Sequence, residues 1–212
     1  MPFLTGHPLD GEGRCRLCRA GRFGFDAAFA YASYEGRLRD LIHLFKYGGV
    51  ETLAGPLGRM LMLAYPRRQS FDLVVPMPMH WWRRWRRGFN QAQLLGAEVG
   101  RRAGVPVEKV VRRCRRTSSQ AGLSRKQRRR NVEGAFAVQR PERVRGKRVL
   151  LVDDVLTTGS TAGACARALK EAGAAYVAVL ALARADRRPL AEPDPLWSRK
   201  LAASQSGAAA CA

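Results

Sequence analysis

The residues with the clearest chemical potential follow a short aliphatic run near the carboxyl end of the chain. Two adjacent acids, Asp153 and Asp154, are followed by hydroxyl groups and a glycine in Thr157, Thr158, Gly159, Ser160 and Thr161. Paired carboxylates accept hydrogen bonds from vicinal sugar hydroxyls or bind Mg²⁺ through water, and a helix N-terminus flanked by hydroxyls suits a phosphate. A phosphate close to a diol describes a ribose 5-phosphate. The simpler interpretation, a capped helix with a closed loop, needs only one acid and fewer hydroxyls.

This segment needs a strand that delivers the acids and a helix that begins just after the hydroxyls. The hydrophobic pattern predicts a βαβ unit with strand 148–152, loop 153–160, helix 161–172 and strand 176–183. Ligands of open α/β sheets bind at the carboxyl ends of the strands, where this loop would lie.

The rest of the chain predicts one α/β domain with short extensions at both ends. Its 212 residues, 46% of them hydrophobic, suffice for one main core. We expect a loop-like segment over 1–24, the domain over 25–184 and a disordered tail over 185–212. Within the domain, the pattern predicts strands at 25–34, 72–76, 105–111 and 134–138, and helices at 37–47, 52–64, 90–103 and 124–131.

Three separated motifs resemble known families, and they occur in the matching order. Residues 149–161 resemble the phosphoribosyl-pyrophosphate loop of type I phosphoribosyltransferases, whereas 87–91 (RGFNQ) and 120–136 (QAGLS to GAF) resemble the ComF family of competence-associated proteins and its GntX-like relatives. The resemblance spans roughly residues 13–184. It implies a type I phosphoribosyltransferase fold, with a mostly parallel central sheet flanked by helices.

The resemblance also implies roles for individual residues. Asp153 and Asp154 would hold the ribose hydroxyls as the catalytic pair, and 157–161 would bind the 5-phosphate. A pyrophosphate loop would contain Pro76 and Met77, and residues 120–136 would form a mobile flap. If transfer occurs, Mg²⁺ and basic residues would stabilise the departing pyrophosphate, for which the candidates are Arg87 and Arg125. No segment for recognising an acceptor base is evident.

Positive charge is concentrated in the middle of the chain. The formal net charge is +21, and residues 83–130 contain 16 Lys and Arg against 2 Glu. Such a segment attracts polyanions. It begins with interleaved aromatic and basic residues that could form a platform for single-stranded DNA, namely Trp81, Trp82, Arg83, Arg84, Trp85 and Arg86. Alternatively, Trp81 and Trp85 pack a helix onto the core, and the basic residues serve pyrophosphate or face only water.

The cysteines predict at most a degenerate metal site. Cys15 and Cys18 have the spacing of half a zinc site, which requires four ligands. ComF-like proteins carry an N-terminal zinc ribbon, and by that resemblance Pro2 and Thr5 stand where two further cysteines would be. We therefore expect a ribbon remnant without an intact zinc site. No run is apolar enough for a membrane span, and no signal peptide is evident, which predicts a cytoplasmic protein.

Three functions remain open at this point. The leading hypothesis is a ComF-like protein that acts in DNA uptake during transformation and binds single-stranded DNA together with phosphoribosyl pyrophosphate or a nucleotide and Mg²⁺. The second is an active phosphoribosyltransferase in nucleobase salvage. The third is a non-catalytic scaffold for a helicase or other uptake proteins.

Overall fold

The domain is built around a four-stranded parallel sheet. The computed structural model describes residues 24–79, 85, 88–114 and 134–185. In this part of the chain the strand order is β1-β6-β5-β2, and a separate antiparallel pair joins β3 to β4. The strands are β1 (Ala27–Ser33), β2 (Leu73–Pro76), β3 (Val111–Arg113), β4 (Phe136–Val138), β5 (Arg148–Leu156) and β6 (Tyr176–Arg184). The predicted mostly parallel sheet is confirmed.

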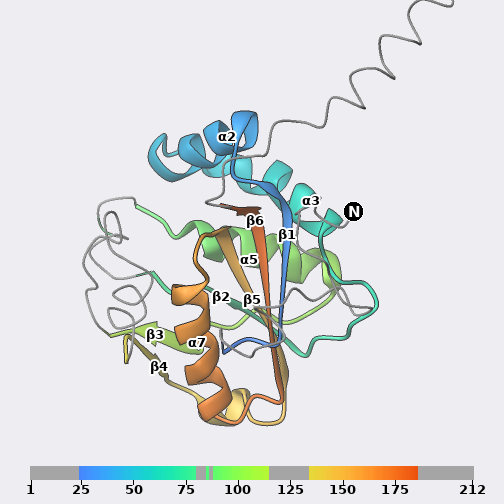
Figure 1. The fold of residues 1–212 in the computed structure, drawn as a ribbon, viewed down its shortest axis with the longest axis vertical. Coiled ribbons are helices and arrows are strands. Elements are labelled where there is room, and N and C mark those ends of the chain that lie inside the picture. The colour runs from blue at the N-terminus through green and yellow to red at the C-terminus, as the bar shows by residue number, and fades with distance from the viewer. Residues whose placement is uncertain (1–23, 80–84, 86–87, 115–133, 186–212) are drawn as a thin grey trace, which may run out of the picture.

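Helices cover both faces of this sheet (Figure 1). Its helices are α2 (Gly36–Tyr47), α3 (Ala54–Leu63), α5 (Gln91–Ala103) and α7 (Ser160–Glu171), with single 3₁₀ turns at Glu51–Leu53 and Pro141–Arg143. Helix α7 and the β3-β4 pair pack on one face, while α2, α3 and α5 pack on the other. No helix among the described residues is long and apolar enough to cross a membrane.

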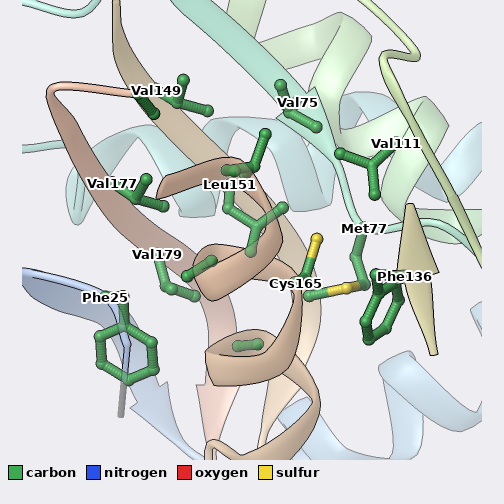
Figure 2. Close-up of a cluster of buried hydrophobic side chains, with 14 of the residues drawn as sticks. Phe25, Val75, Met77, Val111, Phe136, Val149, Leu151, Cys165, Val177 and Val179 are labelled. Atoms are coloured by element: carbon green, nitrogen blue, oxygen red, sulfur yellow. The ribbon is translucent and has the colours of Figure 1, made fainter. Parts of the chain in front are cut away.

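Each face of the sheet has its own hydrophobic core. Leu151 of β5 packs toward α7, in the cluster that contains Cys165 and Val179 (Figure 2). Its neighbour Leu150 packs on the opposite side, with Ile42 of α2 and side chains of α3 and α5. Successive strand residues point to opposite faces and both faces are covered, which explains why residues 149–152 of β5 are all apolar without alternation.

The connections between the strands create a crevice at one edge of the sheet. Strands β2 and β5 are parallel neighbours, with Pro76 paired to Val152. The chain leaves β2 toward α5 on one face and leaves β5 toward α7 on the other. Adjacent strands whose connections diverge in this way form the topological switch point where ligands of open α/β sheets bind.

Two predicted elements differ from the structure. The strand predicted at 105–111 is wrong. Val74 exchanges backbone hydrogen bonds with Pro106 and Glu108, but this contact is a single isolated bridge at Val107 and does not extend into a strand. The strand in this region, β3, begins only at its last residue, Val111. The loop predicted at 153–160 begins too early, since β5 continues to Leu156 beside the long strand β6. The segments 1–23, 115–133 and 186–212, including the basic helix predicted at 124–131, lie outside the described residues.

Candidate functional site

A cavity of about 280 Å³ lies at the carboxyl ends of β2 and β5. Its walls come from four parts of the chain: α2, the loop after β2 with the start of α5, strand β3, and the segment from β5 into α7. The lining residues are Lys46, Met77, Pro78, Met79, Asn90, Ala92, Arg113, Asp153, Asp154, Val155, Leu156, Thr157, Gly159, Thr161 and Ala162. Most of the residues predicted for a phosphoribosyl ligand that the structure describes therefore lie in one cavity.

The two predicted acids lie near the carboxyl end of β5 and both interact with Lys46. The Oδ1 atom of Asp154 lies 3.0 Å from Nζ of Lys46. Asp153 also interacts electrostatically with Lys46 and, more weakly, with Arg113 of β3, and its Oδ1 accepts a hydrogen bond of 2.9 Å from the backbone N–H of Asp154. Successive strand residues point to opposite faces, which explains why the short contact of Lys46 is to Asp154 while Arg113 of β3 influences Asp153. The site thus contains two acids and two bases.

Burial and charge shift the ionisation of this cluster. Burial raises the pKa of Asp153 to about 7, and the neighbouring Asp154 carboxylate acts in the same direction, against the lowering effects of Lys46 and Arg113. Burial alone would lower the pKa of Lys46, but attraction to Asp154 and Asp153 outweighs it, so that pKa is raised. Lys46 is therefore charged at neutral pH, whereas Asp153 titrates close to neutrality. Acids perturbed in this way inside a cavity are typical of functional sites.

The segment predicted to bind phosphate opens α7. Gly159 precedes the helix with φ 72°, a left-handed conformation that glycine adopts at little cost. Thr157, Gly159 and Thr161 line the cavity. Thr158 and Ser160 do not line it; their hydroxyl oxygens lie 3.0 Å apart and hydrogen bond to each other. Of the five residues predicted for the phosphate, three reach the cavity, beside a helix N-terminus that offers backbone N–H groups.

The loop after β2 forms the opposite wall. Pro76 ends the strand, and the backbone N–H of Met77 donates to the Val152 carbonyl at 2.8 Å. The side chain of Asn90 donates from Nδ2 to the Met77 carbonyl at 3.1 Å, while its Oδ1 accepts from the N–H of Ala92 and caps α5. The RGFNQ motif therefore contributes to the site by fixing this loop.

Three polar residues of the site were not predicted from the sequence, namely Lys46, Asn90 and Arg113. Lys46 and Arg113 reach the cavity from elements far from β5 in the sequence, and no local spacing indicates their proximity to the acids. Asn90 offered a signal, since it stood at the first position of a predicted helix, where Asn is a preferred N-cap.

Other predicted site residues are Arg87, Arg125, Trp81, Trp82, Arg83, Arg84, Arg86, Cys15 and Cys18, all of which lie outside the described residues. Within the aromatic stretch the structure describes Trp85, whose exposed fraction is 78%. The alternative in which Trp85 packs onto the core is therefore wrong. An exposed indole is free to stack on a base.

The acids do not form a complete metal cage. Among residues 24–79, 85, 88–114 and 134–185, no three or more His, Cys, Asp or Glu side chains are grouped so that they could hold a metal ion. Mg²⁺, however, commonly keeps several waters and binds through one or two carboxylates plus substrate phosphates. Asp153 and Asp154 fit a Mg²⁺ ion that arrives with a diphosphate and is shared with it.

The parallel sheet, with its Asp-Asp segment leading into a helix at the switch point, defines the chain as an α/β protein of the type I phosphoribosyltransferase class. Residues 90–200 match the family model described as "Phosphoribosyl transferase domain". The fold is similar, over 61% of this chain, to 26% of the glutamine phosphoribosylpyrophosphate amidotransferase of B. subtilis, at 24% identity and a TM-score of 0.43. The chain thus spans about a quarter of that enzyme.

Curated relatives narrow the class further. The chain is 36% identical over 180 residues to Competence protein F of Haemophilus influenzae, which covers 81% of this chain and 78% of that protein. It is 39% identical over 160 residues to DNA utilization protein YhgH of Escherichia coli, covering 72% of this chain and 70% of that protein. The chain belongs to the ComF family of phosphoribosyltransferase-domain proteins.

Proposed function

We propose that this chain is a cytoplasmic ComF-like protein that acts in DNA uptake. In this proposal it binds phosphoribosyl pyrophosphate or a nucleotide, with Mg²⁺, in the cavity between β2 and β5. It also binds single-stranded DNA through the basic segment 83–130. One observation carries the ligand assignment: Asp153 and Asp154 line the same cavity as Gly159 and Thr161 at the N-terminus of α7.

The cavity combines the groups that a sugar phosphate needs. A 5-phosphate would accept hydrogen bonds from backbone N–H groups near Gly159 and from the hydroxyl of Thr161. The ribose diol would donate to the carboxylates of Asp153 and Asp154. Arg113 would provide positive charge for the rest of the anion, while Lys46 pairs with Asp154. Bound with a diphosphate, Mg²⁺ would neutralise the charge that develops on a departing pyrophosphate.

The DNA part of the proposal is supported by charge and by the relatives. Residues 83–130 contribute 16 of the 38 Lys and Arg with only 2 Glu. Neutralising phosphates with such residues provides sequence-independent affinity. The names Competence protein F and DNA utilization protein YhgH, given to two relatives, point to DNA handling for those proteins. The exposed Trp85 adds a stacking surface within the segment.

A second function is favoured by the composition of the cavity. Arg113, which belongs to the basic segment, lines the cavity together with the acids and Lys46, so basic residues of this segment could serve pyrophosphate instead of DNA. An active phosphoribosyltransferase in nucleobase salvage would have this arrangement. It would consume phosphoribosyl pyrophosphate in the presence of Mg²⁺ and a suitable base, whether or not DNA is present.

A thermal-shift experiment tests the ligand assignment. Ligands that bind only the folded protein raise its melting temperature. We expect phosphoribosyl pyrophosphate with Mg²⁺ to raise it in the wild type, and the shift to be lost when Asp153→Asn is combined with Asp154→Asn. Asp40→Asn is the matched control, because Asp40 is an exposed acid on α2 paired with Arg39. A shift that survives the double substitution would contradict the assignment.

A further inference from the structure

Lys46 is the base most directly paired with the acidic pair. Its Nζ lies 3.0 Å from Oδ1 of Asp154, and the exposed fractions of the two side chains are 15% and 13%. Both residues line the cavity. A charge-assisted hydrogen bond at this burial is stronger and less screened by salt than a surface pair. The negative charge of Asp154 is thus offset by the protein itself.

The backbone around Lys46 is held in place from two directions. The preceding residue, Phe45, is completely buried, and its ring centroid lies 5.7 Å from that of Phe89. The Nε2 atom of Gln91, a completely buried side chain, donates to the Lys46 carbonyl at 3.4 Å. The end of α2 is therefore attached to the start of α5, and Lys46 enters the cavity from a fixed base.

The position of this ammonium group matters for ligands that carry no metal. A sugar phosphate approaching the N-terminus of α7 brings negative charge toward Asp153 and Asp154. A diphosphate ligand can bring Mg²⁺ to offset the repulsion, since Mg²⁺ binds readily to paired phosphates. A monophosphate has no such chelating group. For a monophosphate, the ammonium group of Lys46 can offset the repulsion between the phosphate and the two acids. This attraction is strong because the effective dielectric constant in the cavity is well below that of water.

We propose that Lys46 is a ligand-positioning residue that provides, from the protein, the positive charge that Mg²⁺ otherwise brings to the paired acids. A phosphoribosyl ligand without a diphosphate then binds the cavity with no metal ion. The inference rests on the proposed function and deepens it by assigning to Lys46 the charge that lets the same cavity bind a phosphoribosyl monophosphate without a metal ion. The new property is that the cavity binds a monophosphate when no Mg²⁺ is bound.

Calorimetric titration of the full chain tests this inference. The probes are ribose 5-phosphate, which carries the phosphate and the diol only, and phosphoribosyl pyrophosphate, each in EDTA and in Mg²⁺. For ribose 5-phosphate, we expect the wild-type affinity to change less than about 3-fold on adding Mg²⁺. Lys46→Met should weaken it about 10-fold or more in EDTA, and Mg²⁺ should restore much of the loss. Phosphoribosyl pyrophosphate in Mg²⁺ should be much less affected.

Two further variants separate this role from a structural one. Lys46→Arg keeps the charge and should hold the affinity for ribose 5-phosphate in EDTA within about 3-fold of the wild type. Lys170→Met removes another lysine paired with an acid, Asp26, at 2.7 Å, with exposed fractions of 31% and 35%, away from the cavity. It should bind as the wild type does. Melting temperatures without ligand establish that each variant is folded.

Three results would overturn the inference. In the first, wild-type protein binds ribose 5-phosphate only with Mg²⁺. In the second, Lys46→Met weakens that ligand equally in EDTA and in Mg²⁺, which would make Lys46 a general contact. In the third, neither probe binds the wild type under any condition. That last result would remove the proposed ligand function as well, whereas the first two leave it standing.

Discussion

Asn90 joins two parts of the site with one side chain. Its Nδ2 donates to the Met77 carbonyl at 3.1 Å, and its Oδ1 caps α5 by accepting from the N–H of Ala92 at 3.1 Å. The exposed fraction of Asn90 is only 4%, so bulk water has little access to replace these partners. The cavity loop and the helix that anchors Lys46 through Gln91 are therefore stabilised together.

Asn90→Ala should reduce the free energy of unfolding by about 1 to 3 kcal/mol, because it removes a helix cap and leaves a buried carbonyl without its donor. Asn90→Ser retains an acceptor for the cap but loses the amide donor. It should cost less stability, yet weaken phosphoribosyl pyrophosphate binding as much as Asn90→Ala does. Urea unfolding and calorimetry measure the two effects. Equal stability losses in both variants would contradict the separation of cap from loop.

The ionisation of Asp153 predicts a dependence of stability on pH. Its pKa is raised to about 7 in the folded protein, above the value of about 4 expected for an unfolded chain. Between these values the unfolded chain binds fewer protons, so the contribution of Asp153 destabilises the folded state progressively as pH rises from about 4 to about 7. Asp153→Asn should match the wild type near pH 4 and be more stable at pH 8, by roughly 1 to 3 kcal/mol.

Urea unfolding in EDTA from pH 4 to pH 8 measures this difference. Asp40→Asn, which alters an exposed acid on α2, provides the control curve and should track the wild type across the range. An Asp153→Asn variant whose stability differs from the wild type by a constant amount at all pH values would contradict the raised pKa.

Gly159 can be compared with a second glycine of the same backbone conformation. Both Gly159 and Gly146 have φ 72°, so alanine at either position should cost about 1 to 2 kcal/mol of stability. Gly159 lines the cavity at the start of α7, whereas Gly146 lies before β5 and does not. We therefore expect Gly159→Ala to weaken phosphoribosyl pyrophosphate binding and Gly146→Ala to leave it unchanged. Equal losses of affinity would mean that strain alone, without contact to the phosphate, is responsible.

The basic segment predicts a salt-sensitive interaction with single-stranded DNA. Replacing Arg83, Arg84, Arg86 and Arg87 with Ala should lower the affinity and reduce the slope of log K against log salt by up to about 3, at about 0.7 per phosphate contact. Fluorescence anisotropy at several salt concentrations measures both quantities.

A matched variant removes the same charge elsewhere. Four exposed arginines serve this purpose, namely Arg67, Arg68, Arg140 and Arg145. This control should retain most of the affinity and the slope. If it weakens DNA binding as much as the first variant does, net charge rather than the segment is responsible.

The parts of the fold that could be predicted from sequence are those specified locally. The run into Asp153, the hydroxyls and the helix after Gly159 lie within one continuous segment, so their order alone predicted a βαβ unit and its site. Residues 105–111 have a strand-like pattern, but they pair with β2 through only one bridge, at Val107. That outcome depends on the neighbouring strand and not on the run itself.

The cations around the two acids could not be predicted from the sequence. Lys46 lies in the last turn of a helix that was predicted correctly, yet its position beside Asp154 depends on how α2 packs against α5 on the same face of the sheet. Likewise, Asp153 and Asp154 were expected after the strand, but β6 is long enough to pair β5 through Leu156. Side-chain pattern identified the acids, and tertiary packing decided which cations they meet.

The order of the strands has a consequence for how this chain folds during synthesis. β1 and β2 leave the ribosome first but occupy the two edges of the sheet, whereas the central strands β5 and β6 are made last. Neither early strand has its partner until residues beyond Arg148 have emerged. The amino-terminal half therefore cannot complete its sheet in the order of translation. A chain interrupted before Tyr176 lacks β6, so the edges of β1 and β5 that pair with β6 would be exposed. Such unpaired apolar edges are recognised by chaperones and proteases.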